Sequence, residues 1–307
     1  SYKDFSNRVP IQQYESIEPL IERCRKGEQN LFWASQIKWF AKSSGTTNAK
    51  SKFIPVSNEA LEYCHMKAGK DMLCLYINNN LDTQLFSGKG LKLGGSSDIH
   101  EDNKSFFGDL SAILTENLPF WADYRSAPSQ EVALMAEWES KMEAIIDETI
   151  HEDITSLVGV PSWMLVLLHR VLERTGKKHI LEVWPNLEVY FHGGVNFNPY
   201  REQYKKLIPK KEFQYYETYN ASEGFFAIQD RNGSKELLLM LDYGIFYEFI
   251  PMAEYDGENS KAIPLSEVKK GVNYAMVITT NSGLWRYLIG DTVRFTSLAP
   301  YRIKITG

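Results

Sequence analysis

The spacing of apolar residues along the first two thirds of the chain predicts helices that alternate with strands. Apolar positions recur at helical intervals in residues 16–26, 58–70, 130–150 and 161–174, and a further helix starts at Asn198-Pro199. Short apolar runs predict strands over residues 36–41, 72–77 and 187–191. Because strands and helices alternate, we expect an α/β fold with a mainly parallel sheet covered by helices.

After Tyr215 the pattern predicts strands alone. Apolar runs separated by turn residues cover residues 225–229, 236–241, 244–250, 274–280 and 283–295. Asn232-Gly233 is a typical hairpin turn. No helix is needed there, so we expect an antiparallel, barrel-like arrangement. We therefore divide the chain into an α/β part, residues 1–214, and a strand-rich part, residues 215–307.

The composition is that of an ordinary globular protein. Hydrophobic residues make up 43% and aromatic residues 13% of 307, which excludes a disordered chain. The 34 basic and 39 acidic side chains give a net charge of −5, which argues against nucleic-acid binding. Three cysteines without a CxxC pair indicate a reducing compartment. With no long apolar run and no signal sequence, we expect a cytoplasmic monomer that binds no membrane.

Several catalytic motifs are absent from the sequence. It contains no GxxxxGK[ST] phosphate loop, no HExxH zinc motif and no GxSxG nucleophile elbow, and its six histidines are scattered. The most informative segment is therefore the small-residue run from Ser43 to Thr47, which follows a predicted strand and precedes Lys50 and Lys52. Its glycine, backbone amides and hydroxyls suit a phosphate group. An ordinary surface loop is the alternative.

Three shorter segments have both a chemical and a conformational interpretation. The segment Tyr219–Gly224 offers an aromatic ring for a base and a carboxylate, Glu223, for Mg²⁺. Asp291, at the end of Trp285–Asp291, suits ribose hydroxyls. His192-Gly-Gly194 follows a strand, where open α/β sheets bind ligands. Each segment is alternatively a turn or loop built from Asn, Gly and Asp.

The order of these segments distinguishes between the alternatives. An SSGTT loop, then HGG, then YxxSEG, then YxxGD resembles the motif order of adenylate-forming enzymes. The resemblance is closer to the acyl-acid amido synthetases first described as plant auxin-responsive proteins. It includes Lys52–Pro55 and Arg286–Asp291, and residues 5–10 and 159–163 resemble bacterial members of that family. The resemblance covers nearly the whole chain and implies the large amino-terminal domain of that superfamily.

The resemblance implies that ATP and a carboxylic acid give an acyl-adenylate, which an amino acid amine then attacks. Gly193 and Gly194 would lie against the adenine, Tyr219 would stack on it, and Glu223 would hold Mg²⁺ at the phosphates. Thr46, Thr47 and Glu223 would act in catalysis. The residues assigned to the nucleotide are Ser43, Ser44, Gly45, Thr46, Thr47, Lys52, Gly193, Gly194, Tyr219, Asn220, Ala221, Ser222, Glu223 and Asp291.

For the acid, the helix that begins near Gly159 resembles the segment that lines the acyl pocket in this family. Val160, Trp163 and Leu167 would supply an apolar wall, unless they are core residues of a buried helix. The same superfamily includes acyl-CoA and aryl-CoA ligases, which present a thiol in place of an amine. A non-catalytic protein that binds nucleotide or acyl acid is the alternative from another class.

The ends of the chain depart from the family pattern. In the superfamily a small mobile domain follows the large one and brings a lysine to the α-phosphate. This chain lacks an initiator Met and stops at Thr306-Gly307, about where the hinge is expected. We therefore expect the chain to be incomplete at both ends and to lack this lid. Loss of one such donor typically slows a reaction by about a hundred- to a thousandfold.

Overall fold

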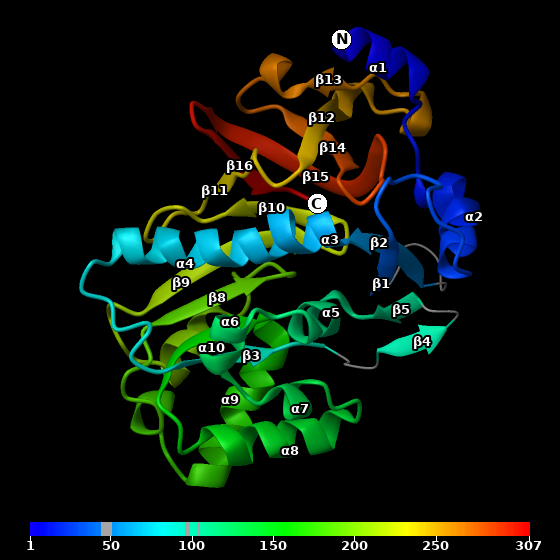
Figure 1. Ribbon diagram of the computed structural model, residues 1–307. Helices are drawn as coiled ribbons and strands as arrows, with labels where there is room; N and C mark the ends of the chain where they lie inside the picture. The colour runs from blue at the N-terminus through cyan, green and yellow to red at the C-terminus, as the bar shows by residue number, and fades with distance from the viewer. Residues whose placement is uncertain (44–50, 96–98, 103–104) are drawn as a thin grey trace.

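The computed structural model describes all residues except 44–50, 96–98 and 103–104, and its strands form two sheets (Figure 1). One half of the larger, twelve-stranded sheet is parallel, as predicted. Its strands, in spatial order, are β6 (Ser126–Ala127), β3 (Lys89–Leu93), β7 (Ile154–Gly159), β8 (Val189–Gly193) and β9 (Gln214–Ala221).

The second half of this sheet is antiparallel and continues directly from β9. Each neighbouring pair in it runs antiparallel, which confirms the change of character predicted after Tyr215. Its strands, in spatial order, are β10 (Gly224–Ile228), β11 (Leu237–Leu239), β16 (Tyr301–Ile305), β15 (Tyr287–Leu298), β14 (Asn273–Thr280), β12 (Ile245–Pro251) and β13 (Ile263–Pro264). Short 3-10 turns interrupt this half at η3 (Met252–Glu254), η4 (Gly257–Asn259) and η5 (Leu265–Glu267).

Helices cover both faces of the parallel half. Helix α4 (Lys67–Asn79) packs on one face through Tyr76, which contacts Phe191 and Tyr216. The opposite face packs against α8 (Trp138–Thr149) and α9 (Pro161–Thr175), and Figure 1 shows these helices on the other side of the sheet from α4. Successive residues of β8 therefore face α4 on one side and α8 and α9 on the other in turn, because successive strand side chains point to opposite faces. The remaining elements beside this half are α6 (Phe120–Tyr124), α7 (Gln130–Ala133), η2 (Ile180–Glu182) and α10 (Arg201–Leu207).

The smaller sheet has the order β2-β1-β5-β4 and shares a hydrophobic core with the antiparallel half. Phe40 and Ile54 of the small sheet belong to the same buried cluster as Phe226 and Ile278. The elements of this region are α1 (Tyr2–Arg8), α2 (Tyr14–Arg25), β1 (Ile37–Ser43), β2 (Lys52–Ser57), α3 (Asn58–Ala60), the π-helical η1 (Leu61–Met66), β4 (His100–Asp102), β5 (Ser105–Gly108) and α5 (Leu110–Glu116).

Three of the predicted elements are wrong in type or extent. Residues 72–77 form the second half of α4 and not a strand, since a short apolar run does not distinguish a strand from a buried helix. The helix predicted over residues 130–150 is two helices, because the Glu137 side chain caps a new one by accepting from the amides of residues 139 and 140. Helix α10 begins at Arg201, after a turn at Asn198-Pro199.

Other predicted boundaries are confirmed by cap geometry. The Ser57 hydroxyl accepts from the Ala60 amide at the start of α3, and Gly176 ends α9 with a φ of +66°. Within the described residues, no helix combines the length and hydropathy that a membrane crossing needs.

Candidate functional site

Two cavities adjoin at the carboxyl ends of β8 and β9. The larger has a volume of about 1480 Å³ and the smaller about 550 Å³. His192, Gly194, Thr218 and Asn220 line both cavities and therefore form a common wall. Open α/β sheets bind ligands at this edge of the sheet. We call the larger one the polar cavity, because it has nearly equal polar and apolar surface, and the smaller one the apolar cavity.

The two glycines of the His192–Gly194 segment are required by the backbone. Gly193 pairs with Thr218 across β8 and β9, and a Cβ on Gly193 would lie 2.6 Å from the Thr218 carbonyl oxygen. Gly194 has a φ of +80°, which favours glycine. Gly194 belongs to the common wall, whereas Gly193 lines the apolar cavity alone. His192 itself stacks on Phe197 at 4.1 Å between ring centroids, and burial lowers its pKa to about 3, so the ring is neutral.

The Tyr219–Gly224 segment forms a tight hairpin between β9 and β10. Ala221 pairs with Gly224, so Ser222 and Glu223 are the two turn residues. The Tyr219 ring packs 4.9 Å from Phe226, and both Tyr219 and Ala221 line the polar cavity. The segment is therefore a turn, as in the conformational interpretation, and Tyr219 to Ala221 border the polar cavity, whereas Ser222 and Glu223 do not line it.

Asp291 lies beside this hairpin although it belongs to β15. The Tyr219 hydroxyl donates to Asp291 Oδ2 at 2.6 Å, and Asp291 also lines the polar cavity. Burial raises the pKa of Asp291, and the hydrogen bond from Tyr219 opposes this shift. The structure thus brings together two predicted site residues that are 72 positions apart in the chain.

Glu223 is the carboxylate with the most perturbed pKa at this site. Burial, with the charge of Asp291, raises its pKa to about 7 against the opposing effects of a backbone hydrogen bond and of Lys52. Lys52 begins β2 opposite Ser43, with its ammonium group 5.5 Å from the centre of the Tyr14 ring. Two carboxylates with one nearby cation form a region that favours additional positive charge.

The predicted phosphate loop lies at the edge of what the structure describes. Ser43 ends β1 and lines the polar cavity. The other members of the loop lie outside the described residues; they are Ser44, Gly45, Thr46 and Thr47.

Arg286, in the same segment as Asp291, has a structural role. It is 5% exposed, and its guanidinium donates to both oxygens of Glu248 at 2.9 Å. It also donates to the backbone carbonyls of Ser6 at 2.9 Å and Val9 at 2.7 Å. Arg286, which directly precedes the strand that carries Asp291, therefore connects this strand to the amino-terminal segment by hydrogen bonds.

The predicted acyl-pocket residues separate into two groups. Val160 and Trp163 line the apolar cavity, and Trp163 is 39% exposed. Leu167 does not line it, because this side chain is fully buried in the core between α9 and the sheet. For Leu167 the alternative interpretation, a core residue of a buried helix, is therefore the one that the packing supports.

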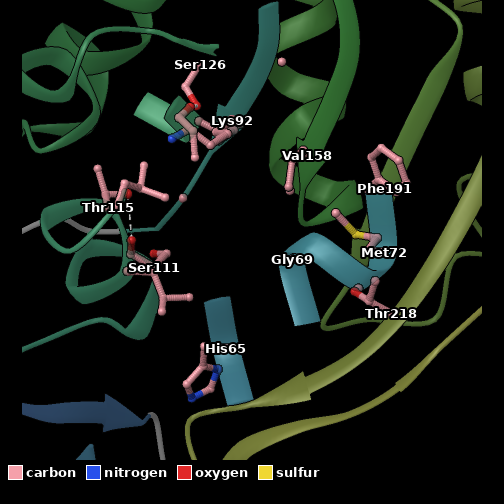
Figure 2. Close-up of a pocket in the computed structure, with 18 of the residues that line it drawn as sticks. His65, Gly69, Met72, Lys92, Ser111, Thr115, Ser126, Val158, Phe191 and Thr218 are labelled. Atoms are coloured by element: carbon pink, nitrogen blue, oxygen red, sulfur yellow. Dashed lines mark hydrogen bonds between the residues drawn. The ribbon is translucent and has the colours of Figure 1, made fainter. Parts of the chain in front are cut away.

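Several polar residues of the apolar cavity were missed from the sequence, His65 and Lys92 among them. His65 lies on the π-helical segment η1, burial lowers its pKa to about 4, and its Nδ1 has no hydrogen-bond partner among the described residues. Lys92 lies on β3, and Figure 2 shows both side chains at the cavity. The alternation Lys-Gly-Leu-Lys-Leu in residues 89–93 is a strand signal for Lys92, whereas nothing in the sequence predicts the π-helix at His65.

Comparison with known proteins identifies the fold. An indole-3-acetic acid-amido synthetase of Arabidopsis thaliana, GH3.3, is 22% identical in an alignment of 357 positions that covers 96% of this chain and 59% of that protein. A solved structure of the AtGH3.15 acyl acid amido synthetase in complex with 2,4-DB matches with a TM-score of 0.81 at 18% identity, covering 100% of this chain and 62% of that one. A 2-hydroxyisobutyryl-CoA ligase in complex with 2-HIB-AMP and CoA matches with a TM-score of 0.64 at 12% identity, covering 99% and 60%.

These matches confirm the α/β fold of the large domain of adenylate-forming enzymes. The chain spans about three fifths of the length of these relatives. The resemblance to bacterial members stays a prediction, since the relative with a named source is a plant protein. A profile described as the GH3 family N-terminal domain matches residues 1–213, and one described as the GH3 family central domain matches residues 238–307. The chain therefore belongs to the GH3 family.

Proposed function

We propose that this protein activates a carboxylic acid with ATP and transfers the acyl group to the amine of an amino acid. In the first step a carboxylate oxygen attacks the α-phosphorus and pyrophosphate leaves. In the second step the amine attacks the acyl carbon, loses a proton, and AMP leaves. The observation that carries the proposal is the common wall between a polar and an apolar cavity, because the reaction joins an anionic nucleotide to an acid.

The polar cavity offers groups for the nucleoside. Asp291 would accept hydrogen bonds from the ribose hydroxyls, since a carboxylate has free lone pairs beyond the one that Tyr219 uses. Gly193 and Gly194 would lie against the adenine, and Tyr219, Asn220 and Ala221 would border it. Gly194 supports this placement, because it lines the polar cavity and carries no side chain, whereas Gly193 lines only the apolar cavity.

The phosphates would lie near the β9–β10 turn and the loop after β1. Ser222 and the predicted loop hydroxyls, including those of Thr46 and Thr47, would donate to phosphate oxygens. Lys52 would balance part of their charge.

Glu223 fits Mg²⁺, which takes only one or two protein carboxylates when phosphates supply other ligands. Its raised pKa fits this role, since a buried carboxylate gains from a cation. The described residues contain no cluster of three or more His, Cys, Asp or Glu that would bind a metal without phosphate. When bound, Mg²⁺ neutralises charge that develops on the phosphate oxygens.

The apolar cavity would hold the acid. Val160 and Trp163 supply part of its wall, and a volume of about 550 Å³ suits a small organic acid. An acid in this cavity that reaches the common wall would present its carboxylate to the nucleotide. This proximity is what a bimolecular attack on the α-phosphorus requires.

Calorimetry with Asp291→Asn tests the nucleotide site. The asparagine oxygen still accepts from Tyr219, so the fold is retained, while the charge that binds the ribose is lost. We expect binding of ATP with Mg²⁺ to weaken by about tenfold or more, since hydrogen bonds to charged groups contribute roughly 1.5–3 kcal/mol. The exposed Asp82→Asn serves as the matched control. Equal affinities of Asp291→Asn and the unaltered protein would refute the assignment.

The likeness to a 2-hydroxyisobutyryl-CoA ligase supports a thiol as the alternative acceptor. Acyl-adenylate can be prepared separately and mixed with the protein and either an amino acid or CoA. We expect an amide from the amino acid. A thioester from CoA would favour the ligase, and adenylate that binds without forming either product would favour a non-catalytic binding protein.

A further inference from the structure

Lys92 lines a mostly apolar cavity and forms no ion pair with a described residue. Its strand, β3, pairs with β6, and Figure 2 shows its side chain beside Ser126. Within the described residues its ammonium group has neither a hydrogen bond nor an ion pair. Burial lowers its pKa to about 8 and the charge of Asp123 opposes this shift, so the group stays mainly charged at neutral pH. Lys92 is half-buried, and a cation partly removed from water costs free energy unless an anion or hydrogen-bond acceptor meets it.

The charges around the apolar cavity favour an anionic ligand. Among the described lining residues the cations are Lys42, Lys70, Lys92 and Arg125, and the acid is Asp109. Asp109 lies within electrostatic range of the buried Lys141, whose pKa it raises against the effect of burial. Asp123, whose charge acts on Lys92, is a second acid, so the cations still outnumber the acids although the whole chain carries a net charge of −5. Such a contrast attracts anions.

Two of these cations, Lys42 and Lys92, stand at separate ends of the cavity. Lys42 is adjacent to Ser43, which lines the polar cavity, so Lys42 lies at the nucleotide end. Lys92 lies on β3, which is two strands away from β8 and its Gly193. At a strand spacing of about 4.8 Å, these strands are roughly 10 Å apart. An acid with a single carboxylate at the nucleotide end would leave Lys92 unpaired.

We propose that the apolar cavity binds acids that carry a second anionic group, and that Lys92 pairs with this group at the end away from the nucleotide. Much of the remaining lining is apolar and includes Leu73, Leu114, Val158 and Phe191. The ligand class is thus a dicarboxylic acid with a hydrophobic middle. The inference rests on the proposed acyl activation, because it specifies which acids that site accepts.

Calorimetric titrations with matched acids test this inference. Hexanoate, octanoate and decanoate are compared with hexanedioate, octanedioate and decanedioate, each titrated into the protein without nucleotide. We expect at least one dicarboxylate to bind about tenfold or more tightly than its monocarboxylate, because a charge-assisted pair with a buried ammonium is stronger than a neutral contact. The gain in affinity of a dicarboxylate over its monocarboxylate should depend on the length of the carbon chain, since the second carboxylate must reach Lys92.

Variants assign the advantage to Lys92. In Lys92→Met the side-chain volume is kept, and the preference for the dicarboxylate should vanish while the monocarboxylate binds at least as well. Lys92→Arg should retain the preference. Lys89→Met is the control, since Lys89 lies on the same strand, pairs with Glu152 and does not line the cavity. If Lys92→Met does not fold, Lys92→Arg and Lys92→Gln provide the same comparison of charged and neutral side chains.

The outcomes separate this inference from the proposed function. Monocarboxylates and dicarboxylates of equal affinity, or a preference that survives in Lys92→Met, would overturn the role of Lys92 and leave acyl activation standing. If no acid of either series binds while ATP binds in an Asp291-dependent manner, both the acid site and this inference fail. ATP binding is measured separately and tests the nucleotide site alone.

Discussion

Replacing Arg286 by methionine should destabilise the protein more than most single substitutions. The guanidinium is nearly inaccessible to water and makes four hydrogen bonds, two to Glu248 and two to backbone carbonyls of the amino-terminal segment. Methionine fills a similar volume but supplies no charge and no donor. Glu248 is 1% exposed and, among the described residues, would keep only the hydrogen bond from the Tyr2 hydroxyl, at 2.8 Å.

The expected magnitude follows from the carboxylate that is left behind. Removing one partner of a buried ion pair typically costs about 3–5 kcal/mol, because the remaining charge is neither solvated nor paired. A chain of 307 residues has an unfolding entropy of about 0.6 kcal/mol/K near 60 °C. The midpoint of thermal unfolding should therefore fall by about 5–8 °C.

Thermal denaturation of single and double variants separates the pair from the rest of the site. In Arg286→Met/Glu248→Leu no charge remains buried, so the loss should be smaller than in Arg286→Met alone. A loss below about 1 kcal/mol in the single variant, or a double variant that loses as much as the single one, would refute this reasoning.

Three further predictions concern the site and its supports. Binding of ATP with Mg²⁺ should strengthen by up to about tenfold per pH unit until pH 7, because Glu223 with its pKa of about 7 must lose a proton. In calorimetry across this pH range, the affinity of Glu223→Gln should change less with pH than that of the unaltered protein. Gly193→Ala should destabilise the fold by about 1–3 kcal/mol in chemical denaturation, through its contact with the Thr218 carbonyl, while Gly69→Ala, with no atom within 4 Å of the new Cβ, should not. Leu167→Ala should cost about 2–5 kcal/mol of stability, whereas Trp163→Ala should mainly weaken acid binding in titrations; the reverse pattern would contradict the packing.

The parts of the fold that local physics determines could be predicted from the sequence. A serine that caps a helix and a glycine that ends one act within a few residues, so Ser57 and Gly176 mark boundaries correctly. The apolar run 72–77 has no such mark, and its helical state follows from a continuous helix and its packing on the sheet. The break before α8 depends on a glutamate, Glu137, which is not among the preferred capping residues.

The candidate site likewise combines residues that the local sequence predicts with residues that only the tertiary structure brings together. Gly193 ends β8, so a sequence pattern could assign it to the ligand-binding edge of the sheet, whereas Tyr219 and Asp291 lie inside β9 and β15 and meet only in the tertiary structure. Lys92 and His65 border the apolar cavity only because β3 and a π-helical turn bring them there, which depends on tertiary structure. Leu167 lies one helical turn after Trp163, yet the first side chain enters the core and the second reaches the cavity.

Strand β9 connects the two halves of the proposed reaction. It pairs in parallel with β8, which carries the glycines, and antiparallel with β10, whose hairpin carries Glu223. Thr218 and Asn220 of this strand line both cavities, and Tyr219 between them reaches Asp291. The boundary that we propose between residues 214 and 215 therefore falls within a strand that borders both ligands. A cut there would divide the site, so the two parts should bind nucleotide and acid only when they are joined through β9.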